Sequence, residues 1–208
     1  MMTEPAFDQL RTKEQLGYIV HTASFKLGKT VSLRIIVQSN SRRPCYLDKQ
    51  VETFLAQYRT VLETLTAEEL NDNIQAVVEK LLEKPKNLDK ETMRYWDEIT
   101  SGSHLFSRRQ READFLRSSV SLEDLKKFFD RYLVPSSSHR RKFSSQFFGT
   151  GHKPCTPAEV INEGVEEGDS PVVSPHSVVL IKDYIDFKRK CSLLPVKSNP
   201  PFASLQKK

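Results

Sequence analysis

A long apolar stripe at helical spacing is the feature that most limits how this chain of 208 residues can fold. Between residues 47 and 65, apolar side chains recur as on one face of an amphipathic helix, at Leu47, Val51, Phe54, Leu55, Tyr58, Val61, Leu62 and Leu65. A helix with such a face is stable only when a sheet or a second helix covers it. The chain is long enough to supply one sizeable core around this helix, so we expect one domain.

The residues before this stripe change from helical spacing to strand alternation. A helix is predicted from residue 4 to about residue 15, and Gly17 ends it. β-Branched residues follow, and apolar and polar side chains alternate from 31 to 38, as in a half-buried strand. We expect two strands there, paired antiparallel and joined near Gly28.

The middle of the chain is predicted to be mainly helical. Thr66 and Ser121 each stand three positions before an acidic residue in a capping box, which marks the start of a helix. With a further cap at Asp89, the apolar spacing predicts helices at 66–82, 89–99, 107–116 and 121–133. From Phe143 to Phe147, alternation predicts a third strand.

The predicted architecture is an α+β fold in which a small antiparallel sheet packs against several amphipathic helices. Residues 1–148 are expected to form this domain. Residues 149–177 are rich in Gly, Pro, Glu and Ser, which predicts a flexible loop or insertion. Residues 178–208 are expected to hold a short terminal strand, a short helix capped by Asp183 and a basic tail.

The composition excludes several classes of protein. No apolar run approaches the ~18 residues that a membrane-spanning helix needs, and the first residues resemble neither a signal peptide nor a transit peptide. The three cysteines are far apart and outside any C-x-x-C motif, which fits reduced thiols in the cytoplasm. The net charge of +5 is a small difference between 32 basic and 27 acidic residues, so no nucleic-acid partner is expected.

No complete catalytic motif is present in the sequence. None of the five histidines has another histidine three to five positions away, so the helical zinc motifs H-E-x-x-H and H-x-x-E-H are absent. The nucleophile motif G-x-S-x-G and the phosphate-binding motif G-x-x-x-x-G-K are absent too. The sequence therefore predicts no metal site in this chain and no activity of the chain alone.

One segment carries a specific resemblance. Residues 7–20, FDQLRTKEQLGYIV, closely resemble the most distinctive segment in the carboxyl-terminal half of pitrilysin-family zinc peptidases of the insulin-degrading-enzyme (insulysin) and nardilysin type. The similarity continues through 82–88, 95–99 and 122–148 and reaches 186–189. The resemblance implies a partial pitrilysin-family domain, which begins inside the family's domain and lacks its first strands.

In this family, two homologous halves close around a chamber, and the amino-terminal half binds zinc through H-x-x-E-H. The resemblance implies that Arg11 and Tyr18 are catalytic contacts, which reach across the chamber and donate hydrogen bonds to the substrate backbone beside the zinc-bound water. These residue types suit that role. A guanidinium presents several N–H groups in a rigid fork, and a phenol can donate to an oxygen on which negative charge grows.

The implied function is that of the substrate-enclosing, carboxyl-terminal part of a cytoplasmic zinc metalloendopeptidase that hydrolyses peptides. Its partners are then peptide substrates and the amino-terminal zinc-binding half, present in cis or in trans. Zinc belongs to the complete enzyme and is not expected on this chain. The alternative is a non-catalytic module that binds peptides or the catalytic half and regulates it.

The resemblance also indicates five basic residues as contacts for a polyanion such as a nucleotide: Lys84, Lys86, Arg140, Arg141 and Lys142. In the family, basic residues at these places line the chamber wall. Asn87 stands where a further lysine is expected. A solvated turn after a helix is the alternative interpretation of this cluster.

The expected absence of the first strands leaves an edge of the sheet without a partner. Unpaired strand edges invite pairing with another chain. We predict that the chain expressed alone dimerises or aggregates, so that its sedimentation coefficient rises with protein concentration in sedimentation velocity experiments. A monomer that sediments at the same rate at every concentration would contradict this prediction.

Overall fold

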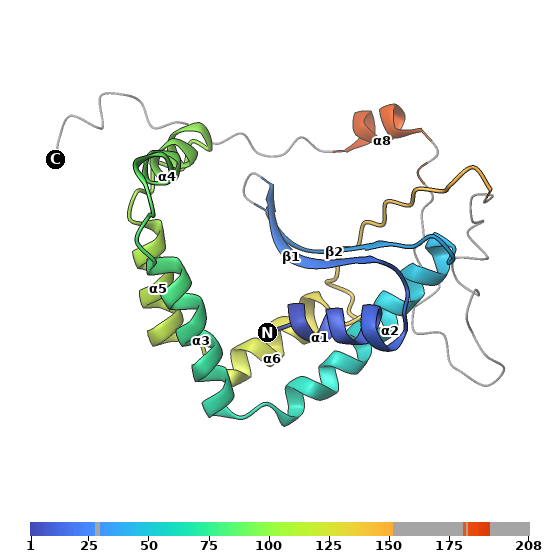
Figure 1. Ribbon diagram of the computed structural model, residues 1–208, viewed down its shortest axis with the longest axis horizontal. Helices are drawn as coiled ribbons and strands as arrows, with labels where there is room; N and C mark the ends of the chain where they lie inside the picture. The colour runs from blue at the N-terminus through green and yellow to red at the C-terminus, as the bar shows by residue number, and fades with distance from the viewer. Residues whose placement is uncertain (28–29, 152–180, 182, 192–208) are drawn as a thin grey trace. The chain divides into compact units, whose positions relative to one another are not determined.

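The computed structural model describes residues 1–27, 30–151, 181 and 183–191 of the chain. Its helices and strands combine in the α+β architecture that the sequence predicts. In chain order (Figure 1) they are α1 (Thr3–Phe7), the π-helix η1 (Asp8–Lys13), β1 (Ile19–Leu27), β2 (Thr30–Gln38), α2 (Pro44–Thr64), α3 (Ala67–Leu82), α4 (Leu88–Thr100), α5 (Arg108–Ser119), α6 (Leu122–Tyr132) and α8 (Tyr184–Lys190). No helix in this described part is long and apolar enough to cross a membrane.

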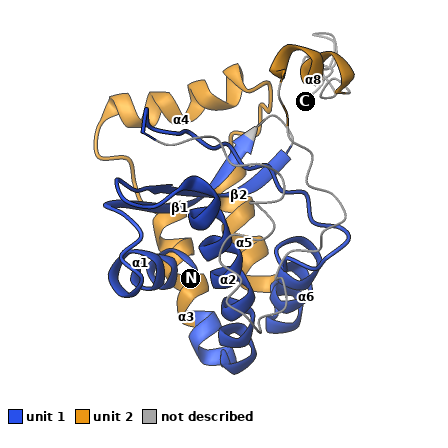
Figure 2. Ribbon diagram, turned by 90° about the vertical axis from the view of Figure 1, so that its right-hand side faces the viewer, with its two compact units in different colours: residues 1–71, 120–180 blue, residues 72–119, 181–208 orange. Residues whose placement is uncertain are grey.

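The chain divides into two compact units (Figure 2). Unit 1 consists of residues 1–71 and 120–180, and unit 2 consists of residues 72–119 and 181–208. Each unit is therefore built from two separate stretches of sequence. This division does not test the domain boundary predicted after residue 148, which adjoins residues outside the described set.

Unit 1 carries the sheet, a pair of antiparallel strands that lie side by side in Figure 1. The strands pair from Ile19 opposite Gln38 to Leu27 opposite Thr30, which confirms the predicted pair. Gly28, where the connection was expected, lies outside the described residues. Alternate residues of β2 pack against the core, as the sequence alternation predicts; they are Leu33, Ile35 and Val37.

The core of unit 1 gathers around α2, the helix with the long apolar stripe. The Tyr58 ring contacts those of Phe54 and Phe129, with ring centroids 5.7 and 5.8 Å apart, and so links α2 to α6. Aromatic pairs of this kind add ~0.5–1.5 kcal/mol beyond their buried area. The buried members of the core are Ala6, Leu10, Leu16, Val20, Leu47, Phe54, Leu55, Tyr58, Leu62 and Phe129.

A buried ion cluster holds the segment after α6 against α2. The Glu52 carboxylate is fully buried and accepts a hydrogen bond from Nη2 of Arg140 at 2.9 Å. The Lys142 ammonium lies 2.7 Å from the same carboxylate oxygen and also pairs with Asp48. Burial raises the pKa of Glu52, but the hydrogen bonds and charges of Arg140 and Lys142 outweigh that effect and hold the pKa below its ordinary value of 4.5.

The chain enters β1 through a close approach of two backbone segments. Gln15 has a left-handed φ of 50°, and the Leu16 N–H donates to the Leu10 carbonyl at 3.0 Å, so the helix ends in a compact turn. At Gly17, an added Cβ would lie 2.0 Å from the Gln38 carbonyl oxygen. Only glycine therefore fits at this position without a shift of the backbone.

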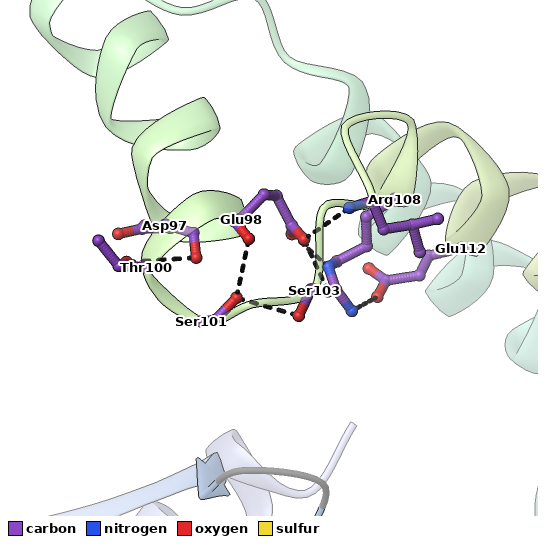
Figure 3. Close-up of polar contacts among 8 residues, drawn as sticks. Asp97, Glu98, Thr100, Ser101, Ser103, Arg108 and Glu112 are labelled. Carbon is purple, nitrogen blue, oxygen red and sulfur yellow. Dashed lines mark hydrogen bonds and ion pairs between the residues drawn. The ribbon is translucent and has the colours of Figure 1, made fainter. Parts of the chain in front are cut away.

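Unit 2 holds α4, α5, α8 and most of α3. Within it, a polar contact joins Glu98 to Arg108 (Figure 3). Nη2 of Arg108 donates to the Glu98 carboxylate at 2.8 Å, and the Leu105 N–H donates to the same oxygen at 3.3 Å. The contact fastens the connection between α4 and α5. It holds the connection in place even though His104 and Gly102 have left-handed φ angles of 50° and 61°.

Most apolar side chains of unit 2 are uncovered. Among its described residues only Val78 and Ala113 are buried apolar residues. Large apolar side chains are exposed on α3, α4, α5 and the connection between the last two: Val77, Leu82, Leu88, Met93, Tyr95, Trp96, Ile99, Phe106 and Phe115. Exposed apolar surface on this scale is typical of a surface that another polypeptide covers.

The structure corrects two predictions about local structure. The third strand is absent, since residues 143–147 have no regular structure and the side chains of Phe143 and Phe147 are exposed. Alternation alone does not make a strand, and residues 143–147 pair with neither β1 nor β2, the strands of the described sheet. The cap of α4 is Asn87 and not Asp89, because the Asn87 side chain accepts the Lys90 N–H at 2.9 Å.

The remaining predicted helices are confirmed, and both capping boxes form. Asp183 caps α8 by accepting the Ile185 N–H at 2.8 Å. Cys45 is disulfide-bonded, which corrects the expectation of reduced thiols, whereas Cys191 is free. The loop predicted at 149–177 and the strand predicted near 178–181 lie mostly outside the described residues.

The ion cluster predicts how stability depends on pH. Glu52→Gln is expected to lower the free energy of unfolding by about 2–4 kcal/mol near neutral pH, because Arg140 and Lys142 lose their buried carboxylate. The pKa of Glu52 is lowered on folding, so its contribution is present above a pH of about 4.5 and is lost as the pH falls through the folded pKa. Urea unfolding at neutral and acid pH should show the gap between variant and wild type shrinking in acid.

Glu123→Gln is the control, because it removes one acidic charge from a side chain that is 75% exposed. It should change the free energy of unfolding near neutral pH by less than about 0.5 kcal/mol. A gap between Glu52→Gln and wild type that stays constant from neutral to acid pH would contradict the assigned role of Glu52.

The close approach at Gly17 gives a second stability prediction. Gly17→Ala is expected to lower the free energy of unfolding by about 1–3 kcal/mol, because the new Cβ collides with the Gln38 carbonyl and the backbone must move. Gly149→Ala is the matched control, since a Cβ added there meets nothing within 4 Å. Thermal unfolding should show a lower midpoint temperature than wild type for Gly17→Ala but not for Gly149→Ala. Equal midpoints for the two variants would contradict the close approach of Gly17 to the Gln38 carbonyl.

Candidate functional site

The segment that carries the family resemblance, residues 7–20, forms one helix–turn–strand unit inside unit 1. It begins at the end of α1, which continues directly into the π-helix η1. The Glu14 N–H donates to the Gln9 carbonyl, five residues earlier, at 3.0 Å. Arg11 lies in η1, and Tyr18 lies immediately before β1. π-Helical turns are rare and occur frequently at functional sites.

The backbone on both sides of the turn is fixed by burial. Leu10 and Leu16 are 0% and 1% exposed, whereas Tyr18 is 81% exposed. Gly17, which lies against the backbone at the end of β2, stands between the buried Leu16 and the exposed Tyr18. Tyr18 therefore presents its side chain to solvent from a well-anchored backbone.

Arg11 lies against the ring of Tyr18. The guanidinium carbon Cζ is 5.0 Å from the centroid of that ring and 4.8 Å from the centroid of the Phe7 ring. Cation–π contacts at exposed sites contribute ~0.5–1 kcal/mol. The structure thus brings the two residues that were predicted as catalytic contacts together on one surface.

The polar groups of Arg11 are available to a ligand. Its guanidinium makes no hydrogen bond or ion pair with any residue that the structure describes. Of the acidic groups near it in the sequence, Asp8 lies 2.8 Å from Lys13, and one carboxylate oxygen of Glu14 accepts a hydrogen bond from Gln9 at 2.8 Å. The arrangement therefore offers guanidinium N–H donors beside a phenol hydroxyl, a combination that can bind carbonyl oxygens or a growing negative charge.

The five predicted polyanion contacts are divided between the two units. Lys84 and Lys86 follow α3 in unit 2, and Lys86 lies 4.0 Å from Glu83. The other three, at positions 140–142, follow α6 in unit 1. Asn87, which stands where a lysine was expected, has a structural role as the cap of α4.

The basic residues of unit 1 already have partners within the chain. Arg140 and Lys142 balance the carboxylates of Glu52 and Asp48 in the buried ion cluster. Nη1 of Arg141 donates to the carbonyl of Ser138 at 3.0 Å and to that of Arg140 at 2.9 Å. Their main visible role is to hold the segment after α6 in place, and polyanion binding stays a prediction.

Potential metal ligands do not gather in the described part of the chain. Within residues 1–27, 30–151, 181 and 183–191, no three His, Cys, Asp or Glu side chains lie close enough together to hold a metal ion. Catalytic zinc usually takes three protein ligands, and the described residues offer no such set. We derive no zinc-dependent step from this chain.

Two residues that contact predicted site residues were not identified from the sequence: Phe7, which contacts Arg11, and Glu52, which contacts Arg140. Phe7 could have been found, because it stands four positions before Arg11 on a helix, the spacing at which helical side chains meet. Glu52 could not, because 88 positions separate it from Arg140 and no local pattern links the two.

The chain is similar in sequence to known proteins. A protein-family model described as PQQ synthase PqqF-like, C-terminal lobe domain 4, matches residues 1–96. The chain is 33% identical to human insulin-degrading enzyme over 201 residues, which cover 94% of this chain and 19% of that relative. It is 31% identical over 186 residues to the peroxisomal insulin-degrading enzyme-like 1 of Arabidopsis thaliana, with 89% of this chain and 18% of the relative covered.

The fold is also similar to that of a solved structure. The match to a crystal structure of pitrilysin has a TM-score of 0.59 and 24% sequence identity, and it covers 65% of this chain and 14% of the other. The chain spans about a fifth of the length of the curated relatives that it matches. With an α+β fold, the segment 7–20 and these relatives, the chain belongs to the pitrilysin family, in which it corresponds to the carboxyl-terminal part of an insulin-degrading-enzyme-like protein.

Proposed function

We propose that this chain is the substrate-enclosing part of a zinc metalloendopeptidase that hydrolyses peptides. The observation that carries the proposal is the helix–turn–strand unit of residues 7–20, which holds Arg11 beside the exposed Tyr18. Relatives whose names describe enzymes that degrade a peptide hormone support the substrate class.

In this proposal, both residues act on the substrate. Arg11 donates N–H groups to carbonyl oxygens of the peptide backbone and so holds the peptide in register. Tyr18 donates its hydroxyl proton in a hydrogen bond to the oxygen on which negative charge grows during water attack. Zinc belongs to the separate half that carries H-x-x-E-H, and no step on this chain passes through it.

Preorganisation makes these donors effective. Hydrogen-bond donors that are already in place need no reorganisation during the reaction, which is why they stabilise the charged state more strongly than water does. Here the buried side chains of Leu10 and Leu16 and the contact at Gly17 fix the backbone that carries both donors. The site therefore has a buried base, which carries the exposed Tyr18 and the partly buried Arg11.

Three further predictions stay open beside this proposal. The cytoplasmic setting is one, whereas the name of the Arabidopsis thaliana relative describes that protein as peroxisomal. Nucleotide or other polyanion binding is the second. The third is the alternative role as a non-catalytic module, which predicts binding to peptides or to the zinc-binding half without cleavage.

Complementation tests the proposal directly. Mixed with a separately expressed half that carries H-x-x-E-H, this chain is expected to restore peptide cleavage. Tyr18→Phe and Arg11→Ala should each lower the restored kcat by about 10²–10³, because each removes donors that act in the transition state. Steady-state kinetics on one fluorogenic peptide measure all of these effects.

A second arginine–tyrosine pair serves as the matched control. On α6, the Arg131 guanidinium lies 5.4 Å from the centroid of the Tyr132 ring, and Tyr132 is 44% exposed. Arg131→Ala and Tyr132→Phe should leave the restored cleavage unchanged. Restored cleavage that is insensitive to Arg11→Ala and Tyr18→Phe would contradict the proposal, and binding without cleavage would favour the regulatory alternative.

A further inference from the structure

Phe7, the last residue of α1, lies against the guanidinium of Arg11. The Arg11 Cζ is 4.8 Å from the centroid of the Phe7 ring, slightly nearer than the 5.0 Å to the centroid of Tyr18. A cation over the face of an aromatic ring is attracted by the negative charge of that face. Two rings therefore hold Arg11, and of these only Tyr18 belongs to the proposed substrate contacts.

These two rings are the contacts that restrain the Arg11 guanidinium. It has no hydrogen-bonding or ion-pairing partner among the residues the structure describes. Of the acidic residues nearest in sequence, Asp8 pairs with Lys13, and one carboxylate oxygen of Glu14 accepts a hydrogen bond from Gln9. An unrestrained arginine side chain samples many rotamers, and ordering it costs entropy. A ring stacked on the guanidinium limits that sampling and leaves the N–H groups at its edges free for a ligand.

We propose that Phe7 is a positioning residue, which directs Arg11 toward the peptide backbone by stacking on its guanidinium. The inference rests on the proposed function, since it requires Arg11 to contact the substrate. Phe7 acts through Arg11 in this account. Loss of the ring leaves the charge of Arg11 in place, but a larger share of its conformers then point away from the substrate.

The first arm of the test uses this chain alone, at a protein concentration at which sedimentation velocity detects no dimer or aggregate. In the wild type, the rings of Phe7 and Tyr18 should shift the Hδ resonances of Arg11 upfield in NMR spectra. Phe7→Leu keeps an apolar side chain and removes the ring, so the upfield shift is reduced, whereas Phe7→Tyr retains it. Resonances of Arg11 that do not move in Phe7→Leu overturn the proposal.

Phe25→Leu is the matched control for this arm. Phe25 is 39% exposed, close to the 40% of Phe7, and the Arg34 guanidinium carbon lies 4.8 Å from its ring centroid. This variant removes from the sheet an arginine–aromatic contact with the same distance between the guanidinium carbon and the ring centroid. It should shift the resonances of Arg34 and leave those of Arg11 unchanged.

The second arm uses the complemented peptidase. Phe7→Leu is expected to lower kcat about two- to fivefold, the effect of losing one exposed cation–π contact, and to leave KM nearly unchanged. Phe7→Tyr should restore the rate, and Phe25→Leu should not change it. In an Arg11→Ala background, Phe7→Leu should cause no further loss, because a residue that acts through Arg11 has nothing left to position.

The outcomes separate this proposal from the proposed function. An equal loss of kcat from Phe7→Leu with and without Arg11 means that Phe7 contacts the peptide itself, and it overturns the positioning role. If Arg11→Ala leaves cleavage unchanged, the proposed function of Arg11 fails, whereas the NMR arm still decides whether Phe7 orders its side chain.

Discussion

The close contact between Gly17 and the Gln38 carbonyl determines where the candidate site lies. There is no room for a side chain between the end of the helical segment and the end of β2, so the two backbones must meet at a glycine. Ile19 pairs with Gln38, so the same contact sets the start of the sheet register. The buried Leu16 and the exposed Tyr18 stand on either side of it. One backbone contact thus links the core, the sheet and the residues that we propose to touch the substrate.

Local patterns were enough to predict most of unit 1. The stripe on α2, the alternation on β2 and the two capping boxes each depend on residues close in sequence, and all of them formed. The strand at 143–147 failed because a strand depends on a neighbour that local alternation does not reveal. The partners of Arg140 and Lys142 and the π-helical path around Arg11 depend on tertiary packing or on backbone geometry. The sequence resemblance identified the site residues, and the stacking on Phe7 became visible only in the structure.

The two units differ in how well they bury their apolar side chains. Unit 1 has a continuous core with a buried ion cluster, as expected of a part that can fold by itself. The described part of unit 2 has few buried apolar residues and exposes large ones on α4, including Trp96 at 54%. The chain spans about a fifth of the length of its curated relatives, so much of their polypeptide has no counterpart here. The exposed apolar surface supports our proposal that the chain works in contact with another half of a larger peptidase.

The most direct test of the central claim is photo-crosslinking from position 18 to a bound peptide. A photoreactive amino acid with a benzophenone side chain would replace Tyr18 in one sample and Phe147 in another. Phe147 is the control position, since both side chains are largely exposed, at 81% and 88%. Each chain would be mixed with the zinc-binding half, with the metal chelated so that the peptide stays intact. Our account predicts that the peptide crosslinks at position 18 and not at position 147. Equal crosslinking at both positions, or none at position 18, would contradict it.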